Sequence, residues 1–306
     1  MKKDIKNIQA SIRARLQNIA RESNRPFAEV LQYYAMERLL YRFSKSHYAG
    51  NFILKGALMF TVWNIPRRRT TLDIDFLARL DNKTTTIEKV VKDLCKVKVM
   101  PDGLVFDPGT VKGQRIKEDA DYEGVRVKFV GFLERSRVPM QLDVGFGDVV
   151  YPRPKMIDYP VILDLPKPRL KGYPLETVVS EKFEAIVKLG LLNSRMKDFY
   201  DIWLMIHQFN FNGSNLTEAL KRTFKHRKTD LPKEKPLFAD EIYDEKSDRQ
   251  ILWKAFLRKG DIQHAPEKLF TTAKEIEKFL IKPLDAINKR IEFKGEWTVS
   301  GSRQPR

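Results

Sequence analysis

Asp73 and Asp75 are the first residues whose type and spacing indicate chemistry. They alternate with apolar residues, which predicts a strand with both carboxylates on one face and a core on the other. The residues expected to face that core are Leu72, Ile74 and Phe76. Two carboxylates held this close repel each other, and a divalent cation between them turns the repulsion into attraction. The pattern therefore predicts a Mg²⁺ site, although two solvated aspartates on an edge strand would have the same spacing.

A third carboxylate, Asp143, is expected beside this pair. Residues 124–133 and 138–146 predict a hairpin with a charged turn at residues 134–137. On the second strand the apolar residues occupy alternate positions, so Asp143 projects from the other face, between Gln141 and Gly145.

A glycine turn precedes the strand of Asp73. Residues 52–80 predict a strand, a turn at Lys55-Gly56-Ala57, a short helical piece, a basic loop and a second strand. A turn of glycine and a small residue, followed by an Asp-x-Asp strand, is the layout of a metal-dependent phosphoryl-transfer site.

Lys182 lies within the apolar stripe of a helix predicted near residues 175–190. A lysine there must either extend to solvent or meet an anion, and a nucleoside triphosphate is an anion of the right kind. On the next helix, Asp198 and Asp201 are one turn apart. Asp198 would hold Lys182 or hydrogen-bond a nucleotide hydroxyl; alternatively, both acids only complement the helix dipole.

The other elements suggest two lobes. Helices are predicted within residues 5–44, with a break at 23–26, and at 84–100. A proline-rich segment at 152–174 is expected to cross between the lobes, which gives predicted domains of residues 1–165 and 166–306. The second lobe is expected to be mainly helical, with helices near 175–190, 197–209, 215–226, 248–258 and 266–291.

The charge of the chain predicts a polyanionic partner. A net charge of +17 and a pI near 9.7 over 306 residues favour nucleic acid, whose phosphates attract Lys and Arg at any sequence. The single cysteine, Cys95, excludes an internal disulfide and a cysteine-based zinc site. No secretion signal and no apolar run of membrane-spanning length is evident, so a cytoplasmic location without membrane contact is expected.

Two basic segments are predicted to contact RNA, although the first reads equally well as a solvated loop. They are residues 221–235, where aromatic side chains are interleaved, and the arginines at 67–69. The residues expected to contact RNA are Arg67, Arg68, Lys221, Arg222, Lys225, Arg227 and Lys228.

Five motifs occur in the order seen in the AbiEii/AbiGii family, which the chain resembles over residues 8–290. This family comprises nucleotidyltransferase toxins of abortive-infection toxin–antitoxin systems, which act in phage defence and are related to the MenT toxins. The motifs are Leu54-Lys55-Gly56-Ala57-Leu58, the segment from Arg69 to Phe76, Leu142-Asp143-Val144, Glu181-Lys182-Phe183-x-Ala185 and Arg195-x-Lys197-Asp198-x-x-Asp201. The superfamily usually has Gly-Ser or Gly-Gly where this chain has Gly56-Ala57, so phosphate binding there would rely on backbone N–H groups.

The resemblance implies a mixed α/β (α+β) protein: a nucleotidyltransferase-fold N-terminal lobe with a mixed sheet, and a mainly helical C-terminal lobe. It implies metal-dependent transfer of a nucleoside monophosphate from an NTP to an acceptor hydroxyl, in related toxins the 3′ end of tRNA, and neutralisation by an antitoxin. Mg²⁺ or Mn²⁺ would be held by Asp73, Asp75 and Asp143, with Lys182 and Asp198 also catalytic. The residues expected to bind the nucleotide are Lys55, Gly56, Ala57, Arg69, Thr71, Lys182 and Asp201.

Two alternatives remain open at this stage. The same fold would serve nucleotidyl transfer to a protein side-chain hydroxyl, which the basic charge disfavours. A basic nucleic-acid-binding module without catalysis would also account for the charge, and metal-dependent activity would distinguish it.

Overall fold

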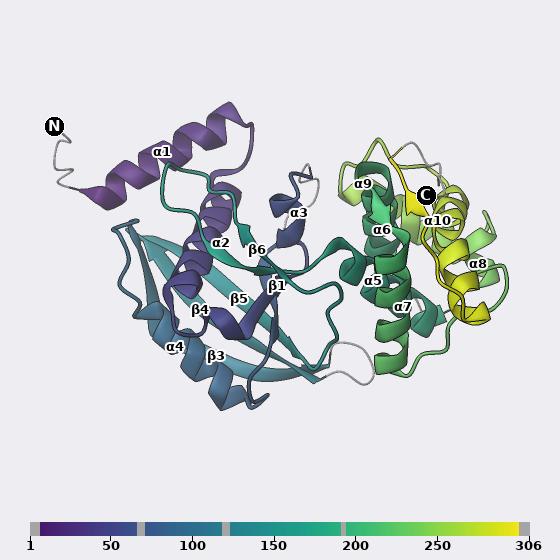
Figure 1. Cartoon of the computed structure of the whole chain (residues 1–306). Coiled ribbons are helices and arrows are strands. Elements are labelled where there is room, and N and C mark those ends of the chain that lie inside the picture. The colour runs from purple at the N-terminus through teal and green to yellow at the C-terminus, as the bar shows by residue number, and fades with distance from the viewer. Residues whose placement is uncertain (1–6, 66–70, 118–122, 191–193, 300–306) are drawn as a thin grey trace. The chain divides into compact units, whose positions relative to one another are not determined.

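The computed structural model describes residues 7–65, 71–117, 123–190 and 194–299 (Figure 1). The chain divides into two compact units. Unit 1 comprises the chain up to Gly147 together with Lys155–Tyr173, and unit 2 comprises Asp148–Pro154 together with the chain from Pro174. Compactness alone does not define an independently folding domain, so the predicted boundary at residues 165/166 stays a prediction.

A mixed seven-stranded sheet forms the centre of unit 1, in the order β3-β4-β5-β2-β1-β7-β6. The strands are β1 (Phe52–Lys55), β2 (Asp73–Ala78), β3 (Leu104–Lys117), β4 (Glu123–Leu133), β5 (Ser136–Phe146), β6 (Lys155–Asp158) and β7 (Arg169–Gly172). Strand β2 runs parallel to β5 and antiparallel to β1, which places the two strands that carry the aspartates side by side.

The helices of unit 1 are α1 (Ile8–Glu22), α2 (Phe27–Lys45), the short α3 (Leu58–Val62) and α4 (Thr84–Cys95), with a 3₁₀ turn at Ala49–Asn51. Helices α2, α3 and α4 contact strands of this sheet, and α1 contacts α2 (Figure 1). Helix α2 contacts α4, β5 and β7, and most of its length is buried. Because burial of apolar area is the main driving force for folding, α2 provides the support on which the strands of the site rest.

The proline-rich segment and Leu72 depart from the sequence prediction. The proline-rich segment was expected to be a connection outside the core, which is wrong: β6 and β7 extend the sheet, and Tyr159, Leu163 and Leu170 belong to the core of unit 1. The prolines flank these short strands rather than interrupting them, as edge strands allow. Leu72 was expected to face the core and is 62% exposed, because β2 begins only at Asp73.

Unit 2 is mainly helical, as predicted (Figure 1). Its helices are α5 (Leu175–Leu189), α6 (Met196–Gln208), α7 (Gly213–Arg227), α8 (Asp240–Tyr243), α9 (Asp248–Lys259) and α10 (Leu269–Lys289). A small two-stranded sheet joins β8 (Phe211–Asn212) to β9 (Glu296–Trp297). The mixed α/β fold class is thus confirmed. Within the described ranges, no helix has the length and apolar character that crossing a bilayer requires.

Candidate active site

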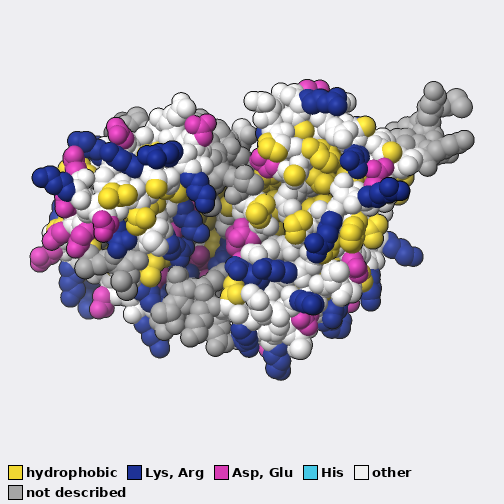
Figure 2. All heavy atoms as spheres, turned by 180° about the vertical axis from the view of Figure 1, so that it is seen from behind, with side chains coloured by type: hydrophobic (Ala, Val, Ile, Leu, Met, Phe, Trp, Pro, Cys, Tyr) yellow, Lys and Arg dark blue, Asp and Glu magenta, His cyan; other side chains and the backbone are white. Residues whose placement is uncertain are grey.

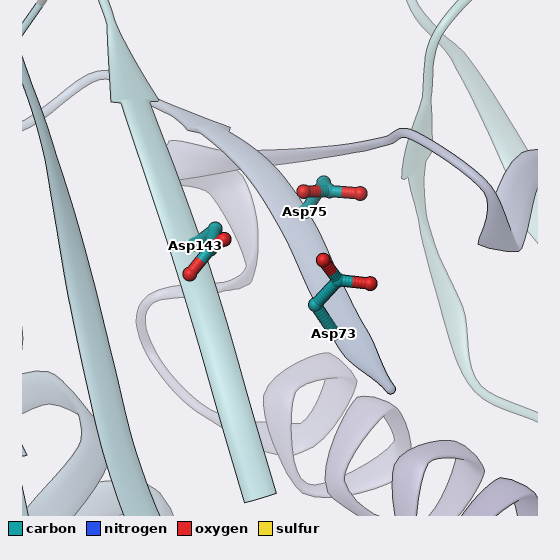
Figure 3. Close-up of side chains that lie close together, drawn as sticks. All are labelled: Asp73, Asp75 and Asp143. Atoms are coloured by element: carbon teal, nitrogen blue, oxygen red, sulfur yellow. The ribbon is translucent and has the colours of Figure 1, made fainter. Parts of the chain in front are cut away.

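Asp73, Asp75 and Asp143 come together on one face of two neighbouring strands (Figure 3). Asp75 on β2 is the register partner of Asp143 on β5, and Asp73 lies two residues away on β2. Each residue offers a carboxylate oxygen, and these oxygens lie within 4.8 Å of one another. Asp143 is buried, and Asp73 and Asp75 are partly exposed.

The aspartates are flanked by two basic residues in a row across four strands. Arg126 on β4 is opposite Asp143, Asp143 is beside Asp75, and Asp75 is opposite Lys55 on β1. Cross-strand partners share a face of a sheet, so the order of charges across this face is plus, minus, minus, plus. The sheet therefore brings Lys55, which was predicted to bind nucleotide, to the aspartates.

Arg126 is a site residue that the sequence analysis missed. Its Nε donates to Asp143 Oδ1 at 2.8 Å and its Nη2 donates to Asp143 Oδ2 at 2.6 Å, a bidentate geometry that guanidinium and carboxylate groups match well. Gln141 also donates to Oδ2, at 3.3 Å. The hydrogen bonds to Asp143 raise the pKa of Arg126 above its ordinary value, and Asp73 and Asp75 add to this effect.

Gly56 is required next to Asp75 for steric reasons. It has φ of +71°, in the left-handed region that favours glycine. A Cβ atom at residue 56 would meet Asp75 Oδ2 at 1.9 Å. The glycine turn thus gives Asp75 the space to hold its carboxylate at the cluster. Ala57 follows as the residue that caps the five-residue helix α3.

Asp73 is fixed through Thr71 and Tyr33. The Thr71 hydroxyl donates to Asp73 Oδ1, and the Thr71 backbone N–H donates to the Tyr33 hydroxyl at 3.0 Å. Thr71 and Tyr33 are both buried, and the Arg25 guanidinium lies 5.2 Å from the Tyr33 ring centre. Helix α2 therefore positions the first aspartate, a role that the periodicity of the sequence did not reveal for Tyr33.

The donor set fits a divalent cation. Oxygens on opposite sides of an octahedral Mg²⁺ are separated by about 4.2 Å, since each metal–oxygen bond is about 2.1 Å. The spacing of up to 4.8 Å needs only small side-chain movements to reach that value. Asp75 Oδ2 packs against Gly56, at the place that a Cβ atom would take, and both oxygens of Asp143 accept from Arg126.

Lys182 in unit 2 forms a buried ion-pair cluster. Its Nζ lies 2.7 Å from Asp198 Oδ1 and 2.8 Å from Asp201 Oδ2, and Arg195 Nε lies 2.6 Å from Asp198 Oδ2. The side chain of Lys182 is 16% exposed and that of Asp198 is fully buried. Burial opposes the charged form of Asp198, but Lys182 and Arg195 outweigh it and hold the pKa of Asp198 below its ordinary value.

The predicted contact of Asp198 with Lys182 is thus present, and Asp201 shares it. Burial likewise opposes the charged form of Lys182, yet the two carboxylates raise the pKa of Lys182 above its ordinary value. The roles predicted for Lys182, Asp198 and Asp201 toward a nucleotide stay predictions.

Four of the five basic residues predicted on α7 and just after it are exposed, and one is not. Lys221, Lys225 and Lys228 are exposed, and Arg222 packs its guanidinium 4.3 Å from the Tyr151 ring centre. Basic side chains are spread among acidic and apolar ones over the face drawn in Figure 2.

Arg227 is not an exposed RNA contact, contrary to the prediction. Its side chain is 10% exposed and pairs with Asp148 at 3.0 Å, Glu184 at 2.8 Å and Glu181 at 3.7 Å. These carboxylates outweigh burial and raise the pKa of Arg227. Arg227 thus joins the end of α7 to Glu181 and Glu184 on α5 and to Asp148. Arg67, Arg68 and Arg69, the other predicted basic residues, lie outside the described residues.

Three clustered carboxylates beside a glycine turn on a mixed sheet could hold a divalent cation, the arrangement that phosphoryl-transfer enzymes use. Residues 38–280 match the family model of the nucleotidyl transferase AbiEii toxin of type IV toxin–antitoxin systems. This match spans most of the chain, so the chain belongs to the AbiEii nucleotidyltransferase toxin family.

Two solved structures from Helicobacter pylori are similar to the chain. JHP933 is 15% identical, with a TM-score of 0.45, over 86% of this chain and 97% of that one. A candidate nucleotidyltransferase is also 15% identical, with a TM-score of 0.43, over 83% of this chain and 96% of that one. A comparison with curated proteins gave no match.

Proposed function

We propose that this toxin transfers a nucleoside monophosphate from an NTP to the 3′ end of tRNA in a reaction that needs Mg²⁺ or Mn²⁺. The observation that carries the proposal is the cluster of Asp73, Asp75 and Asp143 on one face of the sheet, in a chain of a nucleotidyltransferase family. Blocked tRNA would stop translation and growth in the cytoplasm, and a cognate antitoxin would neutralise the toxin.

The chemistry is an in-line displacement at the α-phosphorus of the NTP. The acceptor hydroxyl oxygen would form the new bond to phosphorus, and the bond from phosphorus to the oxygen that bridges to the β-phosphate would break. Pyrophosphate would leave with that oxygen, and the hydroxyl proton would pass to water. A bound divalent cation supplies positive charge at the reacting phosphate and lowers the pKa of the acceptor hydroxyl. Asp73 and Asp75 would hold it, and Asp143 would complete the set.

Residues of the chain supply the remaining charge and shape. Lys55 is in register with Asp75 and would face the phosphates, as would Arg69. Gly56 and Ala57 would approach the phosphates with their backbone, since neither side chain has a hydroxyl. Thr71 would act by fixing Asp73. Lys182 would neutralise the charge that develops on pyrophosphate. Asp198 and Asp201 would position Lys182, because both are buried against it.

The charge of the protein favours RNA as the acceptor. A net charge of +17 and exposed Lys221, Arg222, Lys225 and Lys228 suit a polyanionic strand. Transfer to a protein hydroxyl is the main alternative on the same active site. A binding module without catalysis would not need Gly56 to make space for a carboxylate oxygen beside two others.

The test is to incubate the protein with each NTP labelled at the α-phosphate, with Mg²⁺ or Mn²⁺, and with either total tRNA or RNA-free lysate protein. We expect label at the 3′ end of tRNA, sensitive to periodate pretreatment, which destroys the terminal diol. Label only on protein would contradict the RNA acceptor while preserving the transferase. Absence of label from both acceptors with every NTP and metal would contradict the transferase itself.

A further inference from the structure

Asp143 is already occupied by a cation of the protein's own. Arg126 takes both of its oxygens, at 2.8 and 2.6 Å, and Gln141 takes a further position on Oδ2 at 3.3 Å. A carboxylate that accepts a bidentate guanidinium has its best-placed lone pairs directed at that group. A metal ion that coordinates all three aspartates must therefore displace Arg126 from at least one oxygen.

The other two aspartates lie in different surroundings. Asp73 Oδ1 accepts a hydroxyl from Thr71, which is neutral, and Asp75 Oδ2 lies at the space left by Gly56. Asp73 and Asp75 are also partly exposed, whereas Asp143 is buried. Asp73 and Asp75 are thus the more exposed carboxylates of the cluster, and Asp143 is the one whose two oxygens face a guanidinium.

Arg126 can leave Asp143 without leaving the site. Its side chain is 32% exposed, and its backbone is fixed in β4 by pairing with β5. The charge would remain on the same face of the sheet, where phosphate oxygens of an entering nucleotide are its natural partners. The Arg126 side chain can thus exchange its pairing with Asp143 for another partner on this face of the sheet.

We infer that Arg126 is a resident counter-ion of Asp143, which a divalent cation displaces, and that this competition sets the metal affinity of the site. The inference rests on the proposed metal site. Arg126 is a positioning residue in this account: it holds Asp143 in place and limits charge repulsion among the three aspartates until metal and nucleotide are bound. Tight metal binding then requires the nucleotide, which gives the displaced guanidinium a new partner.

The test is to measure Mn²⁺ binding without nucleotide, both by calorimetry and by electron paramagnetic resonance of the free Mn²⁺. Arg126→Gln should bind Mn²⁺ about 10- to 100-fold more tightly than the unmodified protein, because a unit charge near the ion is removed. Arg126→Lys keeps the charge without the bidentate geometry, so its Mn²⁺ affinity should lie between that of Arg126→Gln and that of the unmodified protein. Arg137→Gln is the matched control, since exposed Arg137 lies six residues from Asp143 on β5, about 20 Å along the strand. It should leave Mn²⁺ affinity within about two-fold.

The gain should vanish in Arg126→Gln combined with Asp143→Asn. Suppose that Mn²⁺ binding to the unmodified protein depends on Asp75, but that both Arg126 variants bind Mn²⁺ no more tightly than the unmodified protein. This result would overturn the inference about Arg126 and leave the proposed metal site intact. If Mn²⁺ never binds the unmodified protein, even with NTP present, the proposed metal site itself fails. If Arg126→Gln unfolds without metal, its midpoint of thermal unfolding should rise with Mn²⁺ more than that of the unmodified protein. An equal rise would also overturn the inference.

Discussion

The Cα atom of Gly56 faces the carboxylate of Asp75 so closely that a Cβ at residue 56 would lie 1.9 Å from Oδ2. This contact links the glycine turn to the acidic cluster. Because Gly56 has no side chain, the Asp75 carboxylate can lie against the turn.

Gly56→Ala should therefore disturb both stability and metal binding. The left-handed backbone alone costs about 1–2 kcal/mol with a side chain, and the clash forces Asp75 to move as well. Gly147→Ala is the matched control, because Gly147 has φ of +83° but nothing within 4 Å of its Cβ position. We expect both variants to unfold at lower denaturant concentration, and only Gly56→Ala to lose Mn²⁺ affinity. Retained affinity in Gly56→Ala would contradict the steric role.

Tyr33→Phe should leave the Asp73 carboxylate less firmly positioned. It leaves the buried backbone N–H of Thr71 without the tyrosine acceptor, which costs about 1–3 kcal/mol. Because Thr71 orients Asp73, we also expect a higher metal concentration for half-maximal transfer. Tyr41→Phe serves as the control, since Tyr41 is buried on the same helix and its hydroxyl shows no hydrogen bond within the described part of the chain. A Tyr33→Phe protein with lower stability but unchanged metal dependence would limit Tyr33 to a structural role.

Lys182→Ala should destabilise the protein, contrary to what the apolar stripe of α5 alone would predict. It leaves Asp198 and Asp201 buried without their shared ammonium, and breaking a buried ion pair costs about 3–5 kcal/mol. Lys225→Ala, on an exposed position of α7, should change stability by less than about 0.5 kcal/mol. Chemical denaturation measures both. An effect of Lys182→Ala no larger than that of Lys225→Ala would contradict the buried cluster.

The pH dependence of the stability lost in Lys182→Ala follows from the directions of the pKa shifts of Asp198 and Lys182. The lowered pKa of Asp198 gives stability that is present above its unfolded pKa of about 3.9 and lost as pH falls through the folded pKa. The raised pKa of Lys182 gives stability present below about pH 10.4 and lost as pH rises through its folded pKa. The difference between the unmodified protein and Lys182→Ala should thus be constant from about pH 5 to 9 and shrink below about pH 4.

Arg227 and Lys225 should separate stability from RNA binding. Arg227→Ala removes the partner of three carboxylates and should lower the unfolding midpoint strongly. Lys225→Ala should leave the midpoint unchanged and weaken tRNA binding, with a smaller salt slope because one phosphate contact is lost. Filter binding at several salt concentrations, together with thermal unfolding, measures the pair. Unchanged tRNA affinity and salt slope in Lys225→Ala would remove that residue from the RNA surface.

Much of the site was predictable because its residues obey strand periodicity. Asp143 was found since apolar neighbours at alternate positions fix the face of an acid between them. Arg126 was missed because of one detail of the hairpin. A four-residue turn at 134–137 would set Lys128 opposite Asp143, whereas the observed two-residue turn pairs Leu133 with Ser136 and Arg126 with Asp143. Register depends on turn length, which charged residues in the turn did not reveal.

Other errors have a different physical origin. No strand was predicted over Leu104–Lys117, which forms β3. Its sequence alternates apolar and polar residues only in part, and the strand carries a register shift between Asp107 and Lys112, so its period is weak. Arg227 was expected on the surface because composition reports charge and not burial. Its three acidic partners lie 43 to 79 residues away in sequence, beyond what a helical pattern can connect.

The most direct measurement of the central claim uses tRNA, Mg²⁺ and NTP labelled at either the α- or the γ-phosphate, with the unmodified protein and Asp75→Asn. The account predicts that label reaches tRNA from the α-phosphate only, because pyrophosphate carries the γ-label away. It also predicts that Asp75→Asn reduces transfer by at least about 10²-fold while tRNA affinity stays within about two-fold. Transfer by Asp75→Asn at the unmodified rate, or γ-label on tRNA, would contradict the assignment of the acidic cluster as a nucleotidyltransferase centre.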